Sequence, residues 1–334
     1  MKKIYCSLLA TILILPLFSS CGVKGSYRTE VFSAMDTAIS IVLYDDFGVS
    51  TEDEKFNNCV TEIKKIITEI ENSVSISLPS SDVYRFNHGE TVMMTDVTKE
   101  LLEKSLYYYE LTNGLFNPAI YPIEEFWGFY DEEPQYPSGS ISDLSFNTDF
   151  KCINYTDFLL TPNNGIKIDL GGIAKGYATD KIKDILDKYE YDYGYVSIGS
   201  SSIYIIDLIN PNATLSIKNP RNDGTFLSIK ASSVKGKFIS TSGDYEKYYI
   251  YEDQRYCHII DPETLYPINN GIMSATVICD SGIYADVLST ALCLGLNPAD
   301  DYRYYVTHNY DGNYKVITND TEDLYTITDT YFSI

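Results

Sequence analysis

The sequence predicts an α+β (mixed α/β) fold in which mixed sheets pack against a few helices. Short alternating segments rich in β-branched residues outnumber helical segments, and they occur in runs rather than in a regular strand–helix–strand order. No fixed-period repeat is present. With 334 residues, 44% of them apolar, the chain can form one large unit or two closely packed ones with a substantial core.

The first half of the chain should contain one early strand, two helices and a long loop. Residues 37–44 alternate in polarity and are rich in β-branched side chains, as strands are. A helix over 53–72 is predicted because apolar residues recur on one face, at Phe56, Val60, Ile63, Ile67 and Ile70. A second helix is expected over 97–111, and the prolines and acids of 131–149 indicate a loop.

The second half should contain most of the strands and two more helices. We expect a strand over 165–170, a tight break at Gly171 and Gly172, and a helix over 173–189. Another helix is expected over 284–296. The remaining strands are expected at 193–198, 202–207, 214–218, 226–231, 247–260, 273–279, 304–308 and 313–318.

Charge and composition exclude one class of partner. The formal net charge is -22, whereas nucleic-acid affinity comes from clustered Lys and Arg that neutralise phosphates. The 31 tyrosines fit half-buried strand positions better than a base-stacking surface. We therefore expect no nucleic-acid partner.

The N-terminus has the features of an export signal. Two lysines precede an apolar stretch over 4–18 that is too short to span a membrane comfortably, and small residues follow it. Residues 1–20 should therefore be a signal peptide. Residues 17–22 resemble a bacterial lipobox, with Phe18 where Leu is more usual, and this resemblance implies lipidation of Cys21. We expect a lipidated tether over 21–30 and an extracytoplasmic location, periplasmic or on the outer surface, lipid-anchored to the cell membrane; the alternative is a plain secretory signal.

The cysteines of the mature chain indicate no zinc site. Cys59, Cys152, Cys257, Cys279 and Cys293 show neither a CxxC pair nor the spacing of a zinc ligand set. Most of them fit small core positions. One disulfide stays possible.

The segment 169–180 could bind an anion. A glycine pair at the start of a helix presents free backbone N–H groups and the positive end of the helix dipole, and Lys175 adds a charge suited to phosphate. A glycine break between a strand and a helix is structural about as often. The segment alone therefore leaves both interpretations open.

Asp286, Ser289 and Thr290 could bind a metal ion. Their spacing places them on one face of the helix predicted there. A carboxylate with hydroxyl and carbonyl oxygens suits magnesium rather than zinc. The alternative is an Asp favoured in the first turn of a helix by the dipole.

His258 is a candidate general base, with Asp261 beside it. It is one of three histidines and follows a predicted strand, and a histidine near neutral pH is the usual group for activating a hydroxyl nucleophile. A lone histidine is more often a satisfied core or edge residue, so spacing alone does not decide its role.

These segments, in this order, closely resemble the FAD:protein FMN transferase (ApbE-type) family. The resemblance covers most of the mature chain, with 31–334 as the flavin transferase domain, and it implies a T-fold-like architecture. Further matching segments are Ala34–Thr37, Ser75–Asn87, Gly114–Pro118 and Trp127–Phe129, beside those around Asp169, Ser240, His258 and Asp286.

The resemblance also implies roles for individual residues. Positions that contact FAD in the family are Met35, Ser77, Leu115, Phe116, Asn117, Asp169, Lys175 and Ile260. The Gly172 carbonyl with Asp286, Ser289 and Thr290 matches the magnesium site, and His258 matches the base that deprotonates the acceptor threonine.

The implied activity is the Mg²⁺-dependent cleavage of FAD, transfer of FMN through a phosphoester bond to a threonine of another protein, and release of AMP. The acceptor would be a flavoprotein subunit of a membrane electron-transport complex or an exported electron carrier.

Several positions depart from the family pattern. Asp36, Ser200 and Leu265 replace glycines, and Asn117 replaces an aspartate. Ser77 stands where an aromatic residue often covers the flavin, which could admit water. An FAD pyrophosphatase that yields FMN and AMP is therefore one alternative, and a non-catalytic flavin-binding lipoprotein is another.

Overall fold

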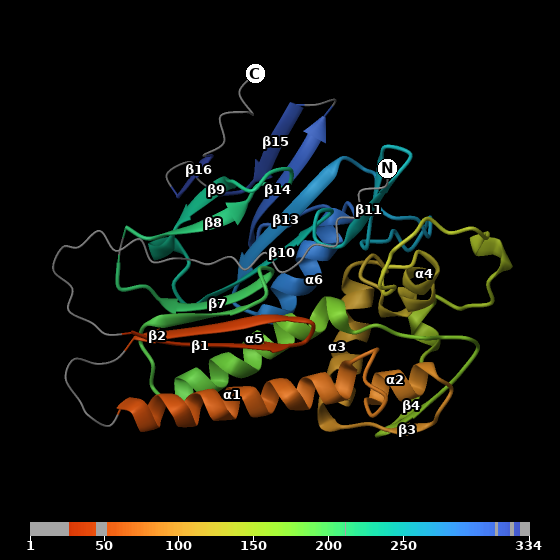
Figure 1. Cartoon of the computed structure of the whole chain (residues 1–334), viewed down its shortest axis with the longest axis horizontal. Coiled ribbons are helices and arrows are strands. Elements are labelled where there is room, and N and C mark those ends of the chain that lie inside the picture. Colours follow the sequence, from red (N-terminus) through yellow and green to blue (C-terminus); the bar gives the residue numbers. More distant parts are fainter. Residues whose placement is uncertain (1–26, 45–51, 211, 311–312, 321–323, 328–334) are drawn as a thin grey trace.

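The fold is built around one antiparallel sheet of eight strands (Figure 1). The computed structural model describes residues 27–44, 52–210, 212–310, 313–320 and 324–327. The strand order is β1-β2-β6-β7-β10-β13-β14-β15. The bounds are β1 Tyr27–Ala34, β2 Thr37–Tyr44, β6 Gly194–Ile198, β7 Ser202–Asp207, β10 Lys237–Gly243, β13 Ile272–Cys279, β14 Arg303–Tyr310 and β15 Asn313–Thr318.

Three smaller sheets surround the main sheet. One has the order β16-β9-β8, one is the hairpin β11-β12, and one has the order β3-β5-β4. Their bounds are β3 Val92–Met93, β4 Asn154–Thr156, β5 Leu159–Thr161, β8 Thr214–Lys218, β9 Thr225–Lys230, β11 Tyr248–Tyr251, β12 Gln254–Cys257 and β16 Tyr325–Ile327.

The helices lie mainly on one face of the main sheet, with α6 against β10 and β13 and α5 against α6 and α1 (Figure 1). The α-helices are α1 Glu52–Val74, α2 Asp82–Asn87, α3 Asp96–Leu111, α4 Tyr121–Phe126, α5 Gly171–Lys188 and α6 Gly282–Cys293. Short 3₁₀ helices are η1 Pro118–Ile120, η2 Ile141–Asp143, η3 Phe150–Cys152 and η4 Ala231–Ser233.

The two faces of the main sheet bury different cores because side chains alternate along each strand. Tyr204 and Phe238 belong to the large core shared with the helices. Ile203, Ile205 and Ile239 belong to a second core that they form with β8 and β9. The expectation of an α+β fold with sheets and packed helices is confirmed.

Helices α5 and α6 approach each other through two glycines. A Cβ atom on Gly176 would lie 2.3 Å from the Gly282 carbonyl oxygen, and one on Gly282 would lie 2.1 Å from Thr179 Oγ1. The carboxylate of Asp180 also accepts hydrogen bonds from the N–H groups of Gly282 (2.6 Å) and Ile283 (3.0 Å) at the start of α6. These contacts fix α6 relative to α5.

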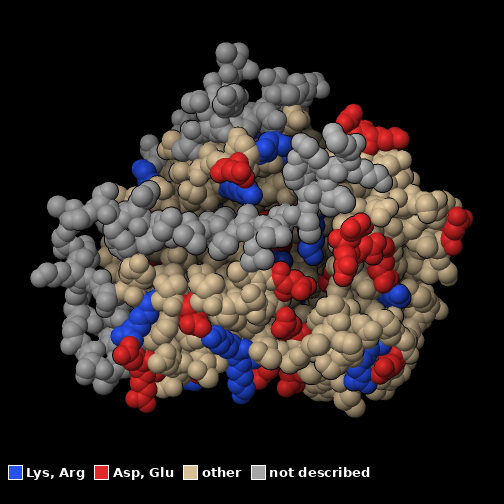
Figure 2. Space-filling model, viewed as in Figure 1, with Lys and Arg blue, Asp and Glu red and all other residues tan. Residues whose placement is uncertain are grey.

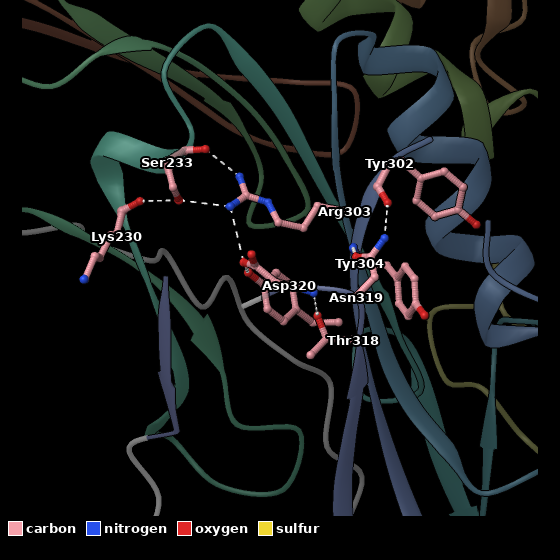
Figure 3. A network of polar contacts seen from close by, with 9 residues as sticks. Lys230, Ser233, Tyr302, Arg303, Tyr304, Thr318, Asn319 and Asp320 are labelled. Atoms are coloured by element: carbon pink, nitrogen blue, oxygen red, sulfur yellow. Dashed lines mark hydrogen bonds and ion pairs between the residues drawn. The ribbon is translucent and has the colours of Figure 1, made fainter. Parts of the chain in front are cut away.

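A buried ion pair joins the last strands to the smaller sheet (Figure 3). Arg303 on β14 lies 3.3 Å from the Asp320 carboxylate, and their side chains are only 17% and 5% exposed. The same guanidinium donates to the hydroxyl and to the carbonyl of Ser233, which lies in the turn after β9. The network therefore connects β14, the end of β15 and η4.

Four predictions about local structure were wrong. Residues 165–170 form no strand, because the backbone of Ile168 bonds the side chain of Asn87 and the Asp169 N–H bonds the Pro118 carbonyl. The glycine pair is not a break, because it forms the first turn of α5. The strand expected over 247–260 is the hairpin β11-β12, which turns at Glu252 and Asp253 with φ of 48° and 61°.

The fourth concerns the tether expected over 21–30. Its residues 27–30 lie in β1, which pairs with β2 along its whole length. The expected signal peptide and Cys21 lie outside the described residues. None of the described helices is long and apolar enough to cross a membrane. The five described cysteines are free thiols, and four of them are buried.

Candidate active site

Asp286 lies at the junction of α6, α5 and the main sheet. Asp286 is only 5% exposed, and its carboxylate accepts three hydrogen bonds. One carboxylate oxygen accepts a hydrogen bond from the Gly176 N–H (2.9 Å). The other accepts from the hydroxyls of Ser240 on β10 (2.8 Å) and Ser202 on β7 (3.2 Å). A buried charge is tolerated when it is bonded in this way.

A row of hydroxyls continues from the Asp286 carboxylate. Ser289 donates to the Asp286 carbonyl (2.9 Å), and its hydroxyl lies 2.8 Å from that of Ser242. The Thr290 hydroxyl lies 3.0 Å from the same Ser242 hydroxyl. The structure therefore brings together three of the four residues predicted to bind a metal, and it adds serines of the neighbouring strands.

The fourth predicted ligand, the Gly172 carbonyl, belongs to the same site. In an α-helix the carbonyl of one residue points to the N–H four residues later, which here is the Gly176 N–H that bonds Asp286. All donors of this set are oxygens, and only one is a carboxylate. No group of three His, Cys, Asp or Glu residues suited to a metal occurs in the described part of the chain. The set thus excludes a zinc-type site but fits a hard cation.

Asp169 lies directly before α5, where its carboxylate is shared by two elements. One oxygen accepts from the Gly171 N–H (2.6 Å), and the other accepts from the Tyr130 hydroxyl. The Tyr130 hydroxyl also lies 3.1 Å from the Glu124 carboxylate. Burial, followed by the charge of Asp169, raises the pKa of Glu124 well above its usual value. The segments around 124–130 and 169–171 therefore form one acidic corner of the site.

His258 follows β12 and is held through its backbone and its ring. Its N–H donates to the Lys247 carbonyl (3.0 Å), and its Nδ1 lies 3.3 Å from the same oxygen. When the Nδ1–H donates to that carbonyl, the Nε2 lone pair is free to accept a proton. Burial, with the charges of Lys247 and Lys175, lowers the pKa of His258 to about 4. The imidazole is therefore neutral at neutral pH.

Lys175, Lys247 and Glu246 connect His258 to the Asp286 cluster. The charges of Lys175 and Lys247 lower the pKa of both His258 and Glu246, and the charge of Asp286 raises the pKa of Glu246. Burial raises the pKa of Glu246, and the charges of Lys175, Lys218 and Lys247 oppose this effect. The charges of Lys175 and Lys247 thus reach this part of the site, where an anionic substrate would be attracted.

Comparison with known proteins decides the family. The model of the ApbE family matches residues 35–310. The chain belongs to the ApbE family.

Two relatives match most of this chain and most of their own length. A protein of Klebsiella pneumoniae (strain 342) named FAD:protein FMN transferase is 26% identical over 269 residues, covering 75% of this chain and 83% of the relative. One from Vibrio cholerae with the same name is 29% identical over 245 residues, covering 70% and 72%.

Solved structures agree with this ApbE fold. The ApbE protein of Thermotoga maritima superposes with a TM-score of 0.75 at 27% identity, covering 89% of this chain and 98% of the other. The flavin transferase ApbE of Vibrio cholerae has a TM-score of 0.74 at 23% identity, covering 88% and 97%, and it supports the fold.

Asn117, Phe116 and Leu115 form the turn that follows α3 in this ApbE domain. The Asn117 side chain accepts from the Ala119 N–H (2.9 Å) and donates to the Thr148 carbonyl (2.9 Å). Phe116 is buried, with its ring 3.4 Å from where a Cβ on Gly172 would lie. The Asp169 N–H bonds the neighbouring Pro118 carbonyl (2.9 Å). The turn therefore lies beside the start of α5.

Met35 and Ser77 lie near the end of α1. The Met35 N–H donates to the Glu71 carboxylate (2.7 Å) in the last turns of the helix. Ser77 follows Val74, is exposed, and donates its N–H to the Ser75 hydroxyl (3.2 Å). The structure describes no direct contact between these two residues and the Asp286 cluster.

Ile260 and Asp261 belong to the turn after His258. Ile260 is buried in a small core with Trp127 and Phe129. The Asp261 carboxylate accepts from the N–H groups of Glu263 (2.8 Å) and Thr264 (3.4 Å), so it stabilises the turn. The ring of His258 is held by the Lys247 carbonyl rather than by Asp261.

The sequence analysis missed several residues of the site. Ser202, Ser242, Glu246, Lys247, Tyr130 and Glu124 gave no motif of their own. One signal was available: Ser240 and Ser242 are two apart in a strand, so they face the same side. Ser202 becomes a neighbour through the sheet order and the other four through the packing of α4 and loops, neither of which local sequence encodes.

Acidic side chains outnumber basic ones on the right-hand side of the face in Figure 2, over the region of α4 and β11 in Figure 1. The exposed acids Asp131, Glu132, Glu133, Glu252 and Asp253 belong to these segments. This acidic surface should repel anions, so an anion should be attracted only close to the cations Lys175 and Lys247.

Proposed function

We propose that this chain is an FAD:protein FMN transferase that requires Mg²⁺, attaches FMN to a threonine of a partner flavoprotein through a phosphoester bond, and releases AMP. The observation that carries the proposal is the hard-oxygen cluster around Asp286, adjacent to Lys175 and a neutral His258. Relatives that are themselves FAD:protein FMN transferases by name support the same activity.

The donor set around Asp286 fits magnesium. A buried carboxylate, the hydroxyls of Ser289 and Thr290 and the Gly172 carbonyl are hard ligands that lie within one junction of two helices and a sheet. Magnesium bound there would neutralise charge on a pyrophosphate and on its leaving group. The chain's own contribution is to hold Asp286 in one orientation through Ser202, Ser240 and the Gly176 N–H.

Lys175 and His258 supply the remaining steps. The Lys175 ammonium would bind a phosphate of FAD near the start of α5. His258 Nε2 would accept the proton of the threonine hydroxyl as that oxygen bonds the FMN phosphorus and the bond to the AMP oxygen breaks. The Lys247 carbonyl orients the ring for this transfer.

The proposed FAD site lies along one side of this centre. It comprises Met35, Ser77, Leu115, Phe116, Asn117, Asp169, Lys175 and Ile260. The contact of Phe116 with Gly172 and the Asp169–Pro118 hydrogen bond support a common location for the residues of 115–117 and 169–175.

The test is an Asp286→Asn variant of the fragment that begins at Gly22, incubated with FAD and MgCl₂. We expect AMP release, followed by chromatography, to fall at least about 100-fold because the carboxylate charge is lost. The matched control is Asp280→Asn, two residues before α6, whose carboxylate is 81% exposed and pairs with Lys237. Full activity of Asp286→Asn, or equal activity with and without MgCl₂, would refute the metal assignment.

A second candidate function is FAD pyrophosphatase activity. The exposed serine at position 77 leaves the flavin side of the site without an aromatic cover, which would let water replace the acceptor hydroxyl. The same reaction mixture distinguishes the two. Transfer gives AMP and flavin bound covalently to an added exported protein, whereas hydrolysis gives AMP and free FMN. FAD binding without AMP release would instead indicate a non-catalytic flavin-binding lipoprotein.

We further propose that the chain is exported and anchored to the cell membrane by lipid on Cys21. The acceptor would then be an exported electron carrier or a flavoprotein subunit of a membrane electron-transport complex. The basic, apolar and small residues of 1–21 support this proposal. Labelling of cells with a palmitate analogue should mark the full chain and leave a Cys21→Ser variant unlabelled.

A further inference from the structure

The Tyr130 hydroxyl and the carboxyl groups of Glu124 and Asp169 meet at the proposed FAD site. The Tyr130 hydroxyl lies 3.1 Å from Glu124 Oε2 and closer still to Asp169 Oδ2. Glu124 is on α4, Tyr130 follows that helix, and Asp169 precedes α5, so the three come from two separate parts of the fold. The proposed reaction gives Glu124 and Tyr130 no role.

Counting protons shows that this group needs one more than Tyr130 supplies. A phenol hydroxyl has a single hydrogen, and an ionised carboxylate only accepts. With both carboxylates ionised, one of the two contacts of the Tyr130 oxygen would place lone pairs against lone pairs. One carboxyl group must therefore carry a proton for both contacts to be hydrogen bonds.

The environment of the two carboxyl groups decides which one carries it. Asp169 also accepts the Gly171 N–H (2.6 Å) and lies at the N-terminal end of α5, which favours negative charge. Glu124 has no such partner among the described groups. The charged groups that face Glu124 are Asp169, Glu125 and Lys247, and only the last favours its ionised form. The Lys247 ammonium lies over the Tyr130 ring, 5.5 Å from its centroid. The proton therefore belongs on Glu124.

We propose that Glu124 and Tyr130 are positioning residues that hold Asp169 as a hydrogen-bond acceptor for an N–H group of the bound flavin nucleotide. Protonated Glu124 donates to Tyr130, and Tyr130 donates to Asp169. Each Asp169 oxygen keeps a further lone pair, because a carboxylate has about four acceptor sites and two are used. The proposal rests on the proposed function, in which Asp169 contacts FAD.

An N–H donor could come from either end of FAD. The adenine has an exocyclic amino group, and the flavin ring has an imide N–H. Both would satisfy an acceptor carboxylate, whereas a carbonyl in the same place would be repelled by it. Nucleotides that lack one donor at a time distinguish the two sources.

The arrangement has a consequence for pH. Burial and the charge of Asp169 raise the pKa of Glu124, so its proton is lost only at a pH well above the usual range of a carboxyl group. After that loss, the single Tyr130 hydrogen is contested by two carboxylates, and Asp169 is no longer held in place. FAD affinity should therefore fall as the pH rises through this titration.

The experiment is a series of FAD titrations followed by flavin fluorescence, with the fragment that begins at Gly22, from about pH 6 to about pH 9.5 at constant MgCl₂. We expect the Kd of the native chain to rise by about tenfold over this range, the loss of one charge-assisted hydrogen bond. Glu124→Gln, which keeps a neutral donor, should match the native Kd at low pH and stay flat. Tyr130→Phe should bind FAD about tenfold more weakly than the native chain does at low pH, and its Kd should stay flat.

The control is Glu110→Gln, on α3, whose carboxylate lies 3.7 Å from the Lys151 ammonium at the surface. It should keep the native pH dependence. Circular dichroism of each variant verifies that it is folded at both ends of the range. Two FAD analogues complete the series: the hypoxanthine analogue lacks the adenine amino group, and N3-methyl FAD lacks the imide N–H. Tyr130→Phe should no longer change the Kd of the analogue that lacks the donor facing Asp169.

The outcomes separate the two proposals. A native chain that binds FAD with a pH-independent Kd, or a Glu124→Gln variant with the native pH dependence, would overturn the role of Glu124 and Tyr130 alone. A chain that binds no FAD at any pH would overturn the proposed function and this role with it.

Discussion

Replacing Gly176 by alanine should damage both the fold and the site. A Cβ at this position would lie 2.3 Å from the Gly282 carbonyl oxygen and 2.7 Å from Asp286 Cβ. A carbon and a carbonyl oxygen normally approach no closer than about 3.3 Å. The two helices would therefore have to separate by about 1 Å at their crossing, since the obstructing atoms belong to backbone and to a first side-chain carbon.

The expected cost follows from this displacement. Overpacking in a close-packed core costs about 1–3 kcal/mol, and rigid backbone neighbours place this substitution at about 3 kcal/mol. The shift also lengthens the hydrogen bond from the Gly176 N–H to Asp286, now 2.9 Å, which should displace the carboxylate from its present position. Loss of stability and loss of AMP release should therefore occur together.

Gly172 provides the matched control one turn earlier on the same helix. A Cβ there would have only Phe116 as a close neighbour, at 3.4 Å, and alanine favours helix by about 0.5–1 kcal/mol over glycine. Urea unfolding followed by circular dichroism should show Gly172→Ala to be as stable as the native chain or more so. A Gly176→Ala variant that loses less than about 1 kcal/mol would refute the close-crossing argument.

Three other perturbations test separate parts of the structure. The pKa of His258 is lowered to about 4 from 6.5, so its neutral form stabilises the fold progressively as the pH rises from about 4 to about 6.5. His258→Gln should flatten this rise in the free energy of urea unfolding and abolish flavin transfer without changing FAD affinity. An unchanged stability profile would contradict the assignment. Arg303→Met leaves Asp320 buried without its cation and should cost about 3 kcal/mol in unfolding free energy, whereas Lys237→Met, which removes an exposed pair, should change it by less than about 1 kcal/mol. Asp36 has φ of 56°, so a β-branched side chain there would be strained. Asp36→Val should lower the free energy of unfolding by about 2 kcal/mol, whereas Asp36→Gly should leave it nearly unchanged. Equal thermal stability of the two variants would contradict this reasoning.

Periodic patterns predicted the elements whose environment is simple. Helix α1 buries Ile63, Ile67 and Ile70 on one face, and its bounds of Glu52–Val74 enclose the predicted helix. Strand β2 has the predicted bounds. In α1 one face contacts the core and the other contacts water, and in β2 the fully buried Ile39, Ile41 and Leu43 recur at every second position, so the hydrophobic period reports the structure directly.

Segments whose partners are side chains or distant turns were not predictable in this way. Residues 165–170 look like a strand because Ile166 and Ile168 alternate with polar residues, and both are indeed buried. Their backbone groups, however, bond the Asn87 side chain and the Pro118 region rather than another strand. Hydrophobic alternation identifies which side chains are buried but not what satisfies the backbone.

The candidate site shows the same division. One helix face supplied Asp286, Ser289 and Thr290, and spacing placed them together. The partners that orient Asp286 come from β7, β10 and α5, which only the order of the sheet brings near. Local sequence therefore predicted that these three side chains lie together, but not the groups that orient Asp286.

Positions where the chain departs from the resembled family bear on its chemistry. Asp36 and Leu265, in place of glycines, keep positive φ of 56° and 63°. Asn117, in place of an aspartate, still accepts the Ala119 N–H at the start of η1. These three substitutions leave the backbone around the site in the conformation that the original residues favour. Ser77 is different, because an exposed hydroxyl cannot replace the apolar surface of an aromatic ring. The balance between transfer and hydrolysis should therefore depend on position 77 rather than on the metal or the base.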